Sequence, residues 1–182
     1  YHGKVRGEEI ANFAYNMKLS TTSVRNVSVY YYDDKRAASA GVTTDTKMNM
    51  SKTFKTTSIG SIVDIGSADP NLQSTTYYQG DKGDEVSDYS WNYQVGTTTI
   101  KNTSVFIYGT TEFARAISAG TELAMSRSLS YKAVDGIGLA PEATTAFYDA
   151  SGAIKVATNL QSETYYHGKV RGEEIANFAY NM

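Results

Sequence analysis

The chain ends with the same residues with which it begins. Residues 1–17 read YHGKVRGEEIANFAYNM, and residues 166–182 repeat that string without a difference. Chance does not produce such a match, so the repeat is either engineered or part of a longer chain with a period of 165 residues. We favour the second explanation, because the 165-residue unit is itself a diverged duplication. Repetition at a fixed period predicts a stacked or tandem architecture.

The inner duplication is visible in two stretches of the unit. The decapeptide at residues 71–80 returns at residues 159–168 with eight of ten positions identical. In addition, residues 7–26 align without a gap to residues 83–102, and most of the exchanged side chains keep their chemistry. We therefore divide the chain into a first half-repeat at 1–77, a second half-repeat at 78–165 with a hairpin insertion near 139–158, and the start of the next repeat at 166–182.

A third stretch aligns less closely. Residues 48–54 match residues 123–129, which places Lys52 and Arg127 at equivalent positions in an apolar row. Such charges serve as an ion pair between subunits or as guards against wrong edge pairing. Equally, the long stem of each side chain could lie on apolar surface while its charged head reaches water.

Composition excludes several classes of protein. A net charge of -2 creates no strong field that would attract nucleic acid or an anionic membrane. The absence of cysteine excludes disulfides and thiolate metal sites, and no apolar stretch approaches the roughly 20 residues that cross a bilayer. The 15 Tyr and 2 Pro residues, with abundant Ser and Thr, are typical of an extracellular β material. A half-repeat would be marginally stable alone, so neighbouring repeats are expected to complete its burial.

Apolar and polar side chains alternate along much of the chain, which predicts strands. The alternation at residues 13–19 returns at 89–95, and residues 27–31 correspond to 103–107. Because the latter two segments are apolar on both faces, we expect their strand to be central and covered on both sides. The predicted fold class is all-β, with two half-repeats of long antiparallel strands, sandwich-like or arch-like, that assemble edge to edge.

Further strands are expected where the alternation is less regular. They lie at residues 44–54 with a partner at 123–131, and at residues 59–65 with a partner at 133–137. The strands would be about ten residues, or roughly 33 Å, long. Residues 112–118 have an apolar spacing that allows a helical turn, although the first-half counterpart supports only a loop.

No pattern in the chain points to an enzyme. We find no nucleophile elbow, phosphate-binding loop, metal-ligand cluster or basic stripe, and we expect no cofactor. His2 and His167 hold one repeat position, where the second half has Gln79, so a polar turn residue is favoured over a catalytic base. A calcium loop at Asp81 and Asp84 is conceivable, but the spacing matches no EF-hand and a solvated turn is favoured.

Three sequons offer sites for N-glycosylation of a secreted chain. Asn26 and Asn102 hold equivalent positions, and Asn49 is the third. Because Ser and Thr are frequent here, chance also produces sequons. A glycan is therefore an expected partner only if the chain is secreted.

These features predict a structural repeat unit of an extracellular filament, sheath or tube on a microbial surface. Its main partner would be a neighbouring repeat or an identical subunit, joined through long edge strands. The alternative is a tandem array of Ig-like β-sandwich modules in an adhesin stalk. The expected assembly strand consists of Phe13, Tyr15 and Met17 near the start and of Phe178, Tyr180 and Met182 at the end.

In its Tyr-, Ser- and Thr-rich composition, its β periodicity and its repetition, the chain resembles the β proteins of archaeal cell sheaths, notably those of filamentous methanogens. Those sheaths are resistant stacks of giant β-sheets. The resemblance implies an extracellular structural role and carries over no binding residues.

Overall fold

The computed structural model describes residues 1–3, 9–62, 69–120, 122–136, 138–141 and 146–182. In this part of the chain eleven strands form one open antiparallel sheet, and the helical element is a 3₁₀ turn at Ile59–Ser61. The all-β prediction is confirmed. The strands are β1 (Phe13–Met17), β2 (Val24–Tyr32), β3 (Lys35–Arg36), β4 (Met48–Phe54), β5 (Leu72–Gln79), β6 (Val86–Tyr93), β7 (Ile100–Tyr108), β8 (Ala114–Arg115), β9 (Met125–Lys132), β10 (Leu160–His167) and β11 (Ile175–Asn181).

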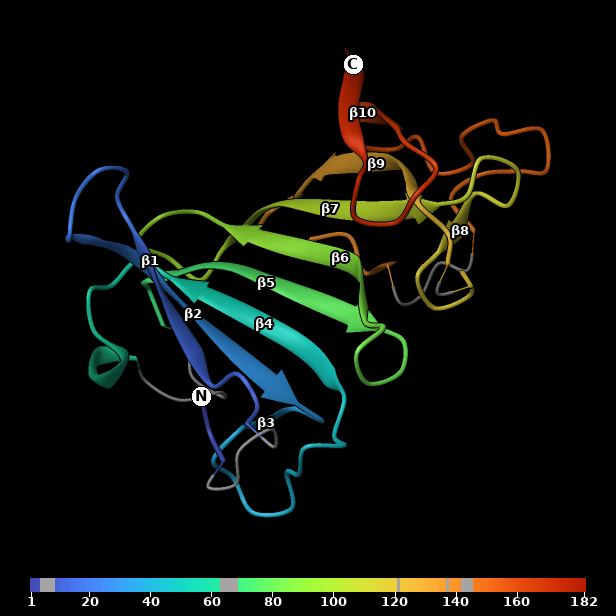
Figure 1. Ribbon diagram of the computed structural model, residues 1–182. Helices are drawn as coiled ribbons and strands as arrows, with labels where there is room; N and C mark the ends of the chain where they lie inside the picture. The colour runs from blue at the N-terminus through green and yellow to red at the C-terminus, as the bar shows by residue number, and fades with distance from the viewer. Residues whose placement is uncertain (4–8, 63–68, 121, 137, 142–145) are drawn as a thin grey trace.

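Each long strand lies beside the strand that precedes it in the chain (Figure 1). The order across the sheet is β1-β2-β4-β5-β6-β7-β9-β10-β11, with short β3 on β2 and short β8 on β7. Figure 1 shows the sheet twisting from β1 to β10, with the two termini at opposite ends. β1 and β11 are therefore the two edges of the sheet.

The second half of the sheet follows the register of the first. Phe54 lies opposite Val27 of β2 and Leu72 of β5, and Tyr131 occupies the same place between β7 and β10. β-Bulges recur at corresponding points of the ladders β5–β6 and β10–β11. The pairing of β1 to β5 is thus matched, strand by strand, by that of β6 to β10.

The register contradicts the alignment that made Lys52 and Arg127 equivalent. Lys52 lies opposite Val29, whereas Val105, the counterpart of Val29, lies opposite Leu129. The true offset differs from the predicted one by two residues. A slip of two residues keeps every side chain on its face, so the hydrophobic pattern could not detect it.

Several strand predictions are wrong in detail. The long strands have 5 to 9 residues, so they are shorter than expected. Ile59–Ser61 is a 3₁₀ turn in which the Ser58 side chain accepts a hydrogen bond from the Gly60 N–H at 3.2 Å, while residues 63–65 lie outside the described part. Two long strands lie outside the predicted segments, β5 and β10, which are the two copies of the repeated decapeptide. Residues 112–118 contain β8 and no helix, and Phe113, with a positive φ of 45°, lies outside the right-handed helical region.

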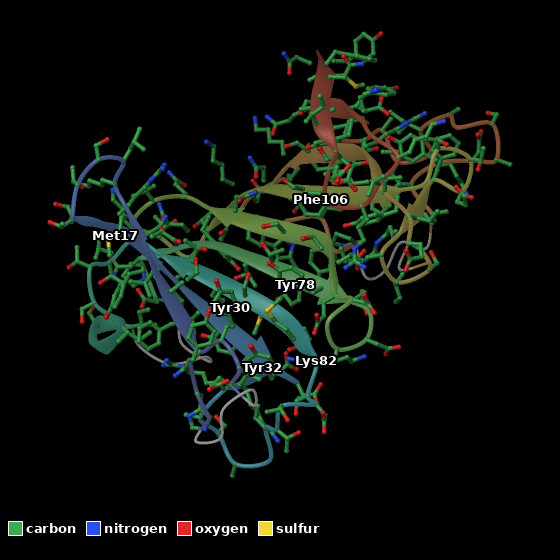
Figure 2. The ribbon with its side chains drawn as sticks, in the orientation of Figure 1. Met17, Tyr30, Tyr32, Tyr78, Lys82 and Phe106 are labelled. Carbon is green, nitrogen blue, oxygen red and sulfur yellow. The ribbon has the colours of Figure 1, made fainter. Side chains whose placement is uncertain are left out.

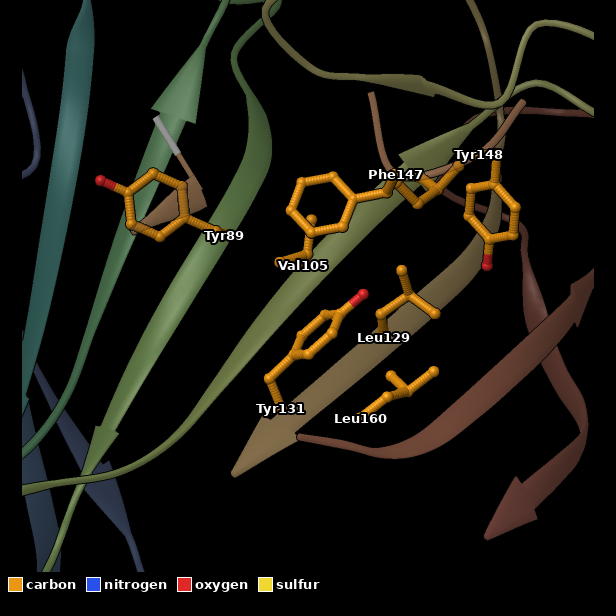
Figure 3. Packing of buried hydrophobic residues seen from close by; sticks show 8 residues of the cluster. Tyr89, Val105, Leu129, Tyr131, Phe147, Tyr148 and Leu160 are labelled. Atoms are coloured by element: carbon orange, nitrogen blue, oxygen red, sulfur yellow. The ribbon is translucent and has the colours of Figure 1, made fainter. Parts of the chain in front are cut away.

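One face of the sheet is apolar, and loops cover it where a sandwich would have a second sheet. Trp91 donates a hydrogen bond from Nε1 to the Leu139 carbonyl at 3.0 Å, and a turn brings Tyr148 opposite Ile154. The insertion near residues 139–158 thus supplies the cover, although residues 142–145 lie outside the described part. The buried cluster of this half consists of Tyr89, Val105, Ile107, Leu129, Tyr131, Phe147, Tyr148 and Leu160 (Figure 3).

The apolar layer continues across the boundary between the half-repeats. Tyr77 of β5 packs against the cluster of the second half and also against that of the first. β5 begins within the first half and ends within the second, so the boundary falls inside a strand and not in a linker. The first-half cluster consists of Val27, Val29, Tyr31, Met50 and Phe54.

The opposite face of the sheet is more open, apart from a small buried cluster of Ile10, Tyr32 and Ala37, against which Tyr30 packs. Ser28 and Tyr30 of β2 point away from the core and are only half-buried, so β2 is central but covered on one side, contrary to the prediction. Figure 2 shows Tyr30, Tyr78 and Phe106 spaced across this face on β2, β5 and β7. Small polar side chains occupy most of the remaining positions.

Candidate assembly interface

β6 shows how a strand of this repeat is bound when a neighbouring strand pairs with each of its two edges. Tyr89 lies opposite Tyr77 of β5 and Val105 of β7, and Trp91 lies opposite Thr75 and Thr103. Tyr89 is only 7% exposed. β6 is therefore an internal reference for the related strands β1 and β11.

β1 reproduces the pairing of β6 with β7. Phe13 lies opposite Val29 and Tyr15 opposite Val27, as Tyr89 and Trp91 lie opposite β7. The register shifts at the last residue of β1, Met17, at the point that corresponds to the shift in β6. β1 is bound to β2 as β6 is bound to β7.

β11 reproduces the pairing of β6 with β5. Phe178 lies opposite Tyr165, and their rings stack with centroids 4.6 Å apart and planes at 17°. The corresponding rings of Tyr77 and Tyr89 stack at 4.5 Å and 22°. Tyr180 lies opposite Glu163, as Trp91 lies opposite the residue equivalent to Glu163 in β5. β1 and β11, which share one sequence, thus divide between them the two contacts that β6 makes alone.

The predicted assembly residues are exposed at both edges. Among the described residues no strand pairs with the second edge of β1 or of β11. Exposure at the predicted positions ranges from 39% at Tyr15 to 67% at Met182, while Phe13 is half-buried. Edge strands with exposed aromatic side chains favour pairing with another strand. The remaining exposed values are 52% for Met17, 45% for Phe178 and 58% for Tyr180.

A short pairing precedes β1, as an isolated antiparallel bridge between His2 and Ile10. His2 and Ile10 exchange two backbone hydrogen bonds, each 2.8 Å long. His167 at the end of β10 lies opposite Ile175 in the same way. Residues 1–2 therefore sit beside the β1 hairpin as the end of β10 sits beside β11.

A glutamate binds the turn before β6 to β4, and another binds the turn before β11 to β9. Glu85 accepts the Met48 N–H at 3.0 Å, and Glu174 accepts the Met125 N–H at 2.8 Å. Each carboxylate also accepts a glycine N–H of its own turn, at 2.9 and 2.8 Å. Arg171 donates to the Glu85 carbonyl at 3.1 Å, so successive turns also touch each other.

The sequon asparagines lie in strands and form hydrogen bonds on the open face. Asn16 donates to Asn26 at 2.7 Å, and Asn92 donates to Asn102 at the same distance. Asn49 donates to the Asp34 carboxylate at 2.8 Å. The equivalence of Asn26 and Asn102 thus has a structural counterpart, an amide pair between neighbouring strands.

A buried ion pair distinguishes the second half from the first. The Arg115 guanidinium binds the Asp88 carboxylate through two nitrogens, and both side chains are buried. The first half has Asn12 in place of the carboxylate, and Arg36 donates to it at 3.5 Å. The strand repeated at residues 13–17 and 178–182 is thus preceded by a neutral asparagine, Asn12 or Asn177, where β6 supplies the Asp88 carboxylate.

A second ion pair lies beside β11. Arg127 reaches Glu163 at 3.2 Å, and its guanidinium lies over the rings of Phe113, Tyr148 and Tyr165. The Arg127 side chain is thus bound within the chain. This contact within the chain gives no support to the inter-subunit and guard-charge interpretations for Arg127. The ion pair and the cation–π contacts offset the cost of burying this charge.

The remaining sequence candidates show no cluster of chemical groups. Asp84 lies 3.5 Å from the Arg171 guanidinium, and Asp81 lies in the turn before it. Within the described residues, no three His, Asp or Glu side chains are arranged as metal ligands would be. No helix in the same residues has the length and apolar character needed to cross a bilayer.

Sequence reasoning missed the turn glutamates and the Arg115–Asp88 pair. Glu85 and Glu174 were visible as a repeated acidic position, but their acceptor role depends on strand order. Arg115 lies in residues 112–118, whose apolar spacing allows a helical turn or a loop. No protein-family model, curated protein or solved structure matches the chain, so the interface is interpreted from its geometry alone.

Proposed function

We propose that this chain is a structural repeat unit of an extracellular filament, sheath or tube on a microbial surface. The observation that carries the proposal is that β1 and β11 reproduce, one each, the two contacts of the internal strand β6. A strand of this sequence can therefore join one unit to the next without altering the register.

The sheet provides the means of extension. Neighbouring units joined through a shared strand would continue the antiparallel order without a linker, because the half-repeat boundary already falls within β5. Each junction would bury aromatic side chains that are exposed at the edges, and it would complete backbone hydrogen bonds. Both contributions repeat at every junction, which favours an indefinite assembly.

The open face supports the same role. Its small Ser, Thr and Asn side chains allow close approach of a second sheet or of surface glycans, and Tyr30, Tyr78 and Phe106 add apolar contacts (Figure 2). Stacked sheets of this kind are what the resemblance to sheath proteins implies. A glycan on Asn26 or Asn102 would lie on this face.

The adhesin-stalk alternative has less support. Ig-like modules consist of two packed sheets, and tandem modules are separate bodies. Here one sheet runs through both half-repeats and Tyr77 belongs to both cores.

Localisation and imaging test the proposed function directly. Antibodies against the purified chain are applied to intact and sectioned source cells, and the labelled material is imaged in negative stain. We expect label on the outside of intact cells, on filaments or sheets. Label confined to the cell interior, or to isolated particles, would overturn the proposal.

A further inference from the structure

We propose that β11 of one unit takes the place of β1 on β2 of the next unit, and that two copies of this chain, like two units of a longer chain, join head to tail through this strand. This inference rests on the proposed function and names its partner as a second copy of this chain. It requires β1 to leave β2, whereas β11 already has an unpaired edge among the described residues.

The edge of β2 on which β1 lies is called the seat below. It can pair with the sequence of β11. Residues 13–17 and 178–182 are identical, so an incoming β11 can repeat the pairs that Phe13 and Tyr15 make with Val29 and Val27. While seated there, the same strand remains paired to β10 of its own chain, as β6 remains paired to β5. The result is the internal arrangement of β6 formed between two chains.

Side chains beside the seat would find the same partners. Tyr32 donates to the Ala11 carbonyl at 2.9 Å, and the incoming strand has Ala176 at that position. Asn26 accepts from Asn16 at 2.7 Å, and the incoming strand has Asn181 there. The exchanged strand therefore offers the edge of β2 the same hydrogen-bonding groups as β1 does.

The Arg36 and Arg115 positions select this seat against the similar one on β7. A strand on β2 meets Arg36, whose partner is the neutral Asn12, and β11 offers Asn177 at that position. A strand on β7 meets buried Arg115, which binds the Asp88 carboxylate. Asn177 cannot neutralise that guanidinium, so β11 is matched to β2 and mismatched to β7.

The chain's own β1 competes for the seat. Because β1 is tethered to β2, it acts at an effective concentration on the order of millimolar. We therefore expect the unaltered chain to exchange slowly at micromolar concentration, and a chain with a disabled β1 to exchange readily.

Backbone geometry supplies a matched pair of variants in the full-length chain. The Tyr30 N–H donates to the Asn12 carbonyl, and hydrogen-bonded pairs alternate along an antiparallel ladder, so the Ala14 N–H points toward β2. The Met182 N–H donates to the Gln161 carbonyl, so by the same alternation the Ala179 N–H points away from β10. Proline at either position removes that N–H.

The test compares Ala14→Pro, Ala179→Pro and the double variant by light scattering and negative stain. We expect Ala14→Pro to form linear polymers whose mass rises several-fold with concentration, because its seat is open and its β11 is intact. In Ala179→Pro, β1 stays paired with β2, and β11 lacks the N–H that would bind β2 of another copy. This variant should therefore remain monomeric. The double variant has an open seat and no competent donor, so it should also remain monomeric.

A synthetic peptide of residues 166–182 separates strand exchange from misfolding. It should bind the double variant at a ratio of one to one and shorten the Ala14→Pro polymers, whereas the peptide with Ala179→Pro should do neither. Folded, monomeric Ala14→Pro, or aggregates that the peptide does not dissolve, would overturn the inference. If surface filaments are labelled in cells while Ala14→Pro stays monomeric, strand exchange fails and the proposed function stands.

Discussion

At the scale of residues, a buried arginine makes the two half-repeats unequal. Arg115 and Asp88 are both buried, whereas Arg36 is half-buried and faces the neutral Asn12. A buried charge whose partner is removed is strongly destabilising, because the desolvated ion is left uncompensated.

We therefore expect Asp88→Ala to lower the free energy of unfolding by about 3–5 kcal/mol in urea titration. The matched control is Asn12→Ala, which removes a neutral partner and should cost under about 1 kcal/mol. Equal losses from the two variants would contradict the assigned difference between the seats.

Buried tyrosines make stability sensitive to alkaline pH. Burial is the main cause that raises the pKa of Tyr108, Tyr131 and Tyr148, and at Tyr148 the Glu163 carboxylate raises it further. The folded state thus holds these protons more tightly than the unfolded chain, whose tyrosine pKa is about 10. Their stabilising contribution is complete below about pH 10 and is lost as pH rises through the folded pKa values.

We expect unfolding to set in above about pH 10, and the part of the tyrosinate absorbance that comes from the buried tyrosines should rise together with the loss of β circular dichroism. Tyr131→Phe should show a smaller alkaline loss of stability, although it also gives up the hydrogen bond to the Val156 carbonyl at 2.9 Å. Ionisation of all 15 tyrosines without loss of β circular dichroism would contradict this coupling.

At the scale of elements, the turn between β5 and β6 holds the register of the repeat. Gly80 has a φ of 116°, and a Cβ built on it would lie 2.7 Å from the Asp84 carbonyl oxygen. Gly83, in the same turn, also has positive φ but has nothing within 4 Å of such a Cβ. The two glycines separate backbone strain from a steric clash.

We expect Gly80→Ala to cost about 3 kcal/mol, because backbone strain and the clash with the Asp84 carbonyl add. Gly83→Ala should cost only about 1 kcal/mol, from strain alone. Thermal and urea unfolding of the two variants provide the measurement. A loss at Gly83 as large as that at Gly80 would show that the clash is relieved by a shift of the turn.

At the scale of the whole molecule, the halves are coupled through one sheet and a shared Tyr77. We expect a single cooperative unfolding transition. Leu129→Ala in the second half and Met50→Ala in the first should each lower its free energy by about 2–5 kcal/mol. Calorimetry on both variants is the measurement, and two separable transitions, each sensitive to one variant, would indicate independent modules.

The sequence by itself determined the strands whose alternation survives in both halves. β1, β2, β6 and β7 lie within or close to the predicted segments, because a period of two is a property of the local chain. The choice of Phe178 and Tyr180 as expected assembly residues rested on sequence identity alone, and both side chains are exposed.

Tertiary structure decided the rest. The correspondence of Lys52 with Leu129 depends on which residues face each other across strands, and alternation cannot distinguish registers two residues apart. The single sheet, the loop cover and the Arg115–Asp88 pair depend on contacts between segments far apart in the chain. Such contacts are fixed by packing and burial in three dimensions, which no local pattern of residues records.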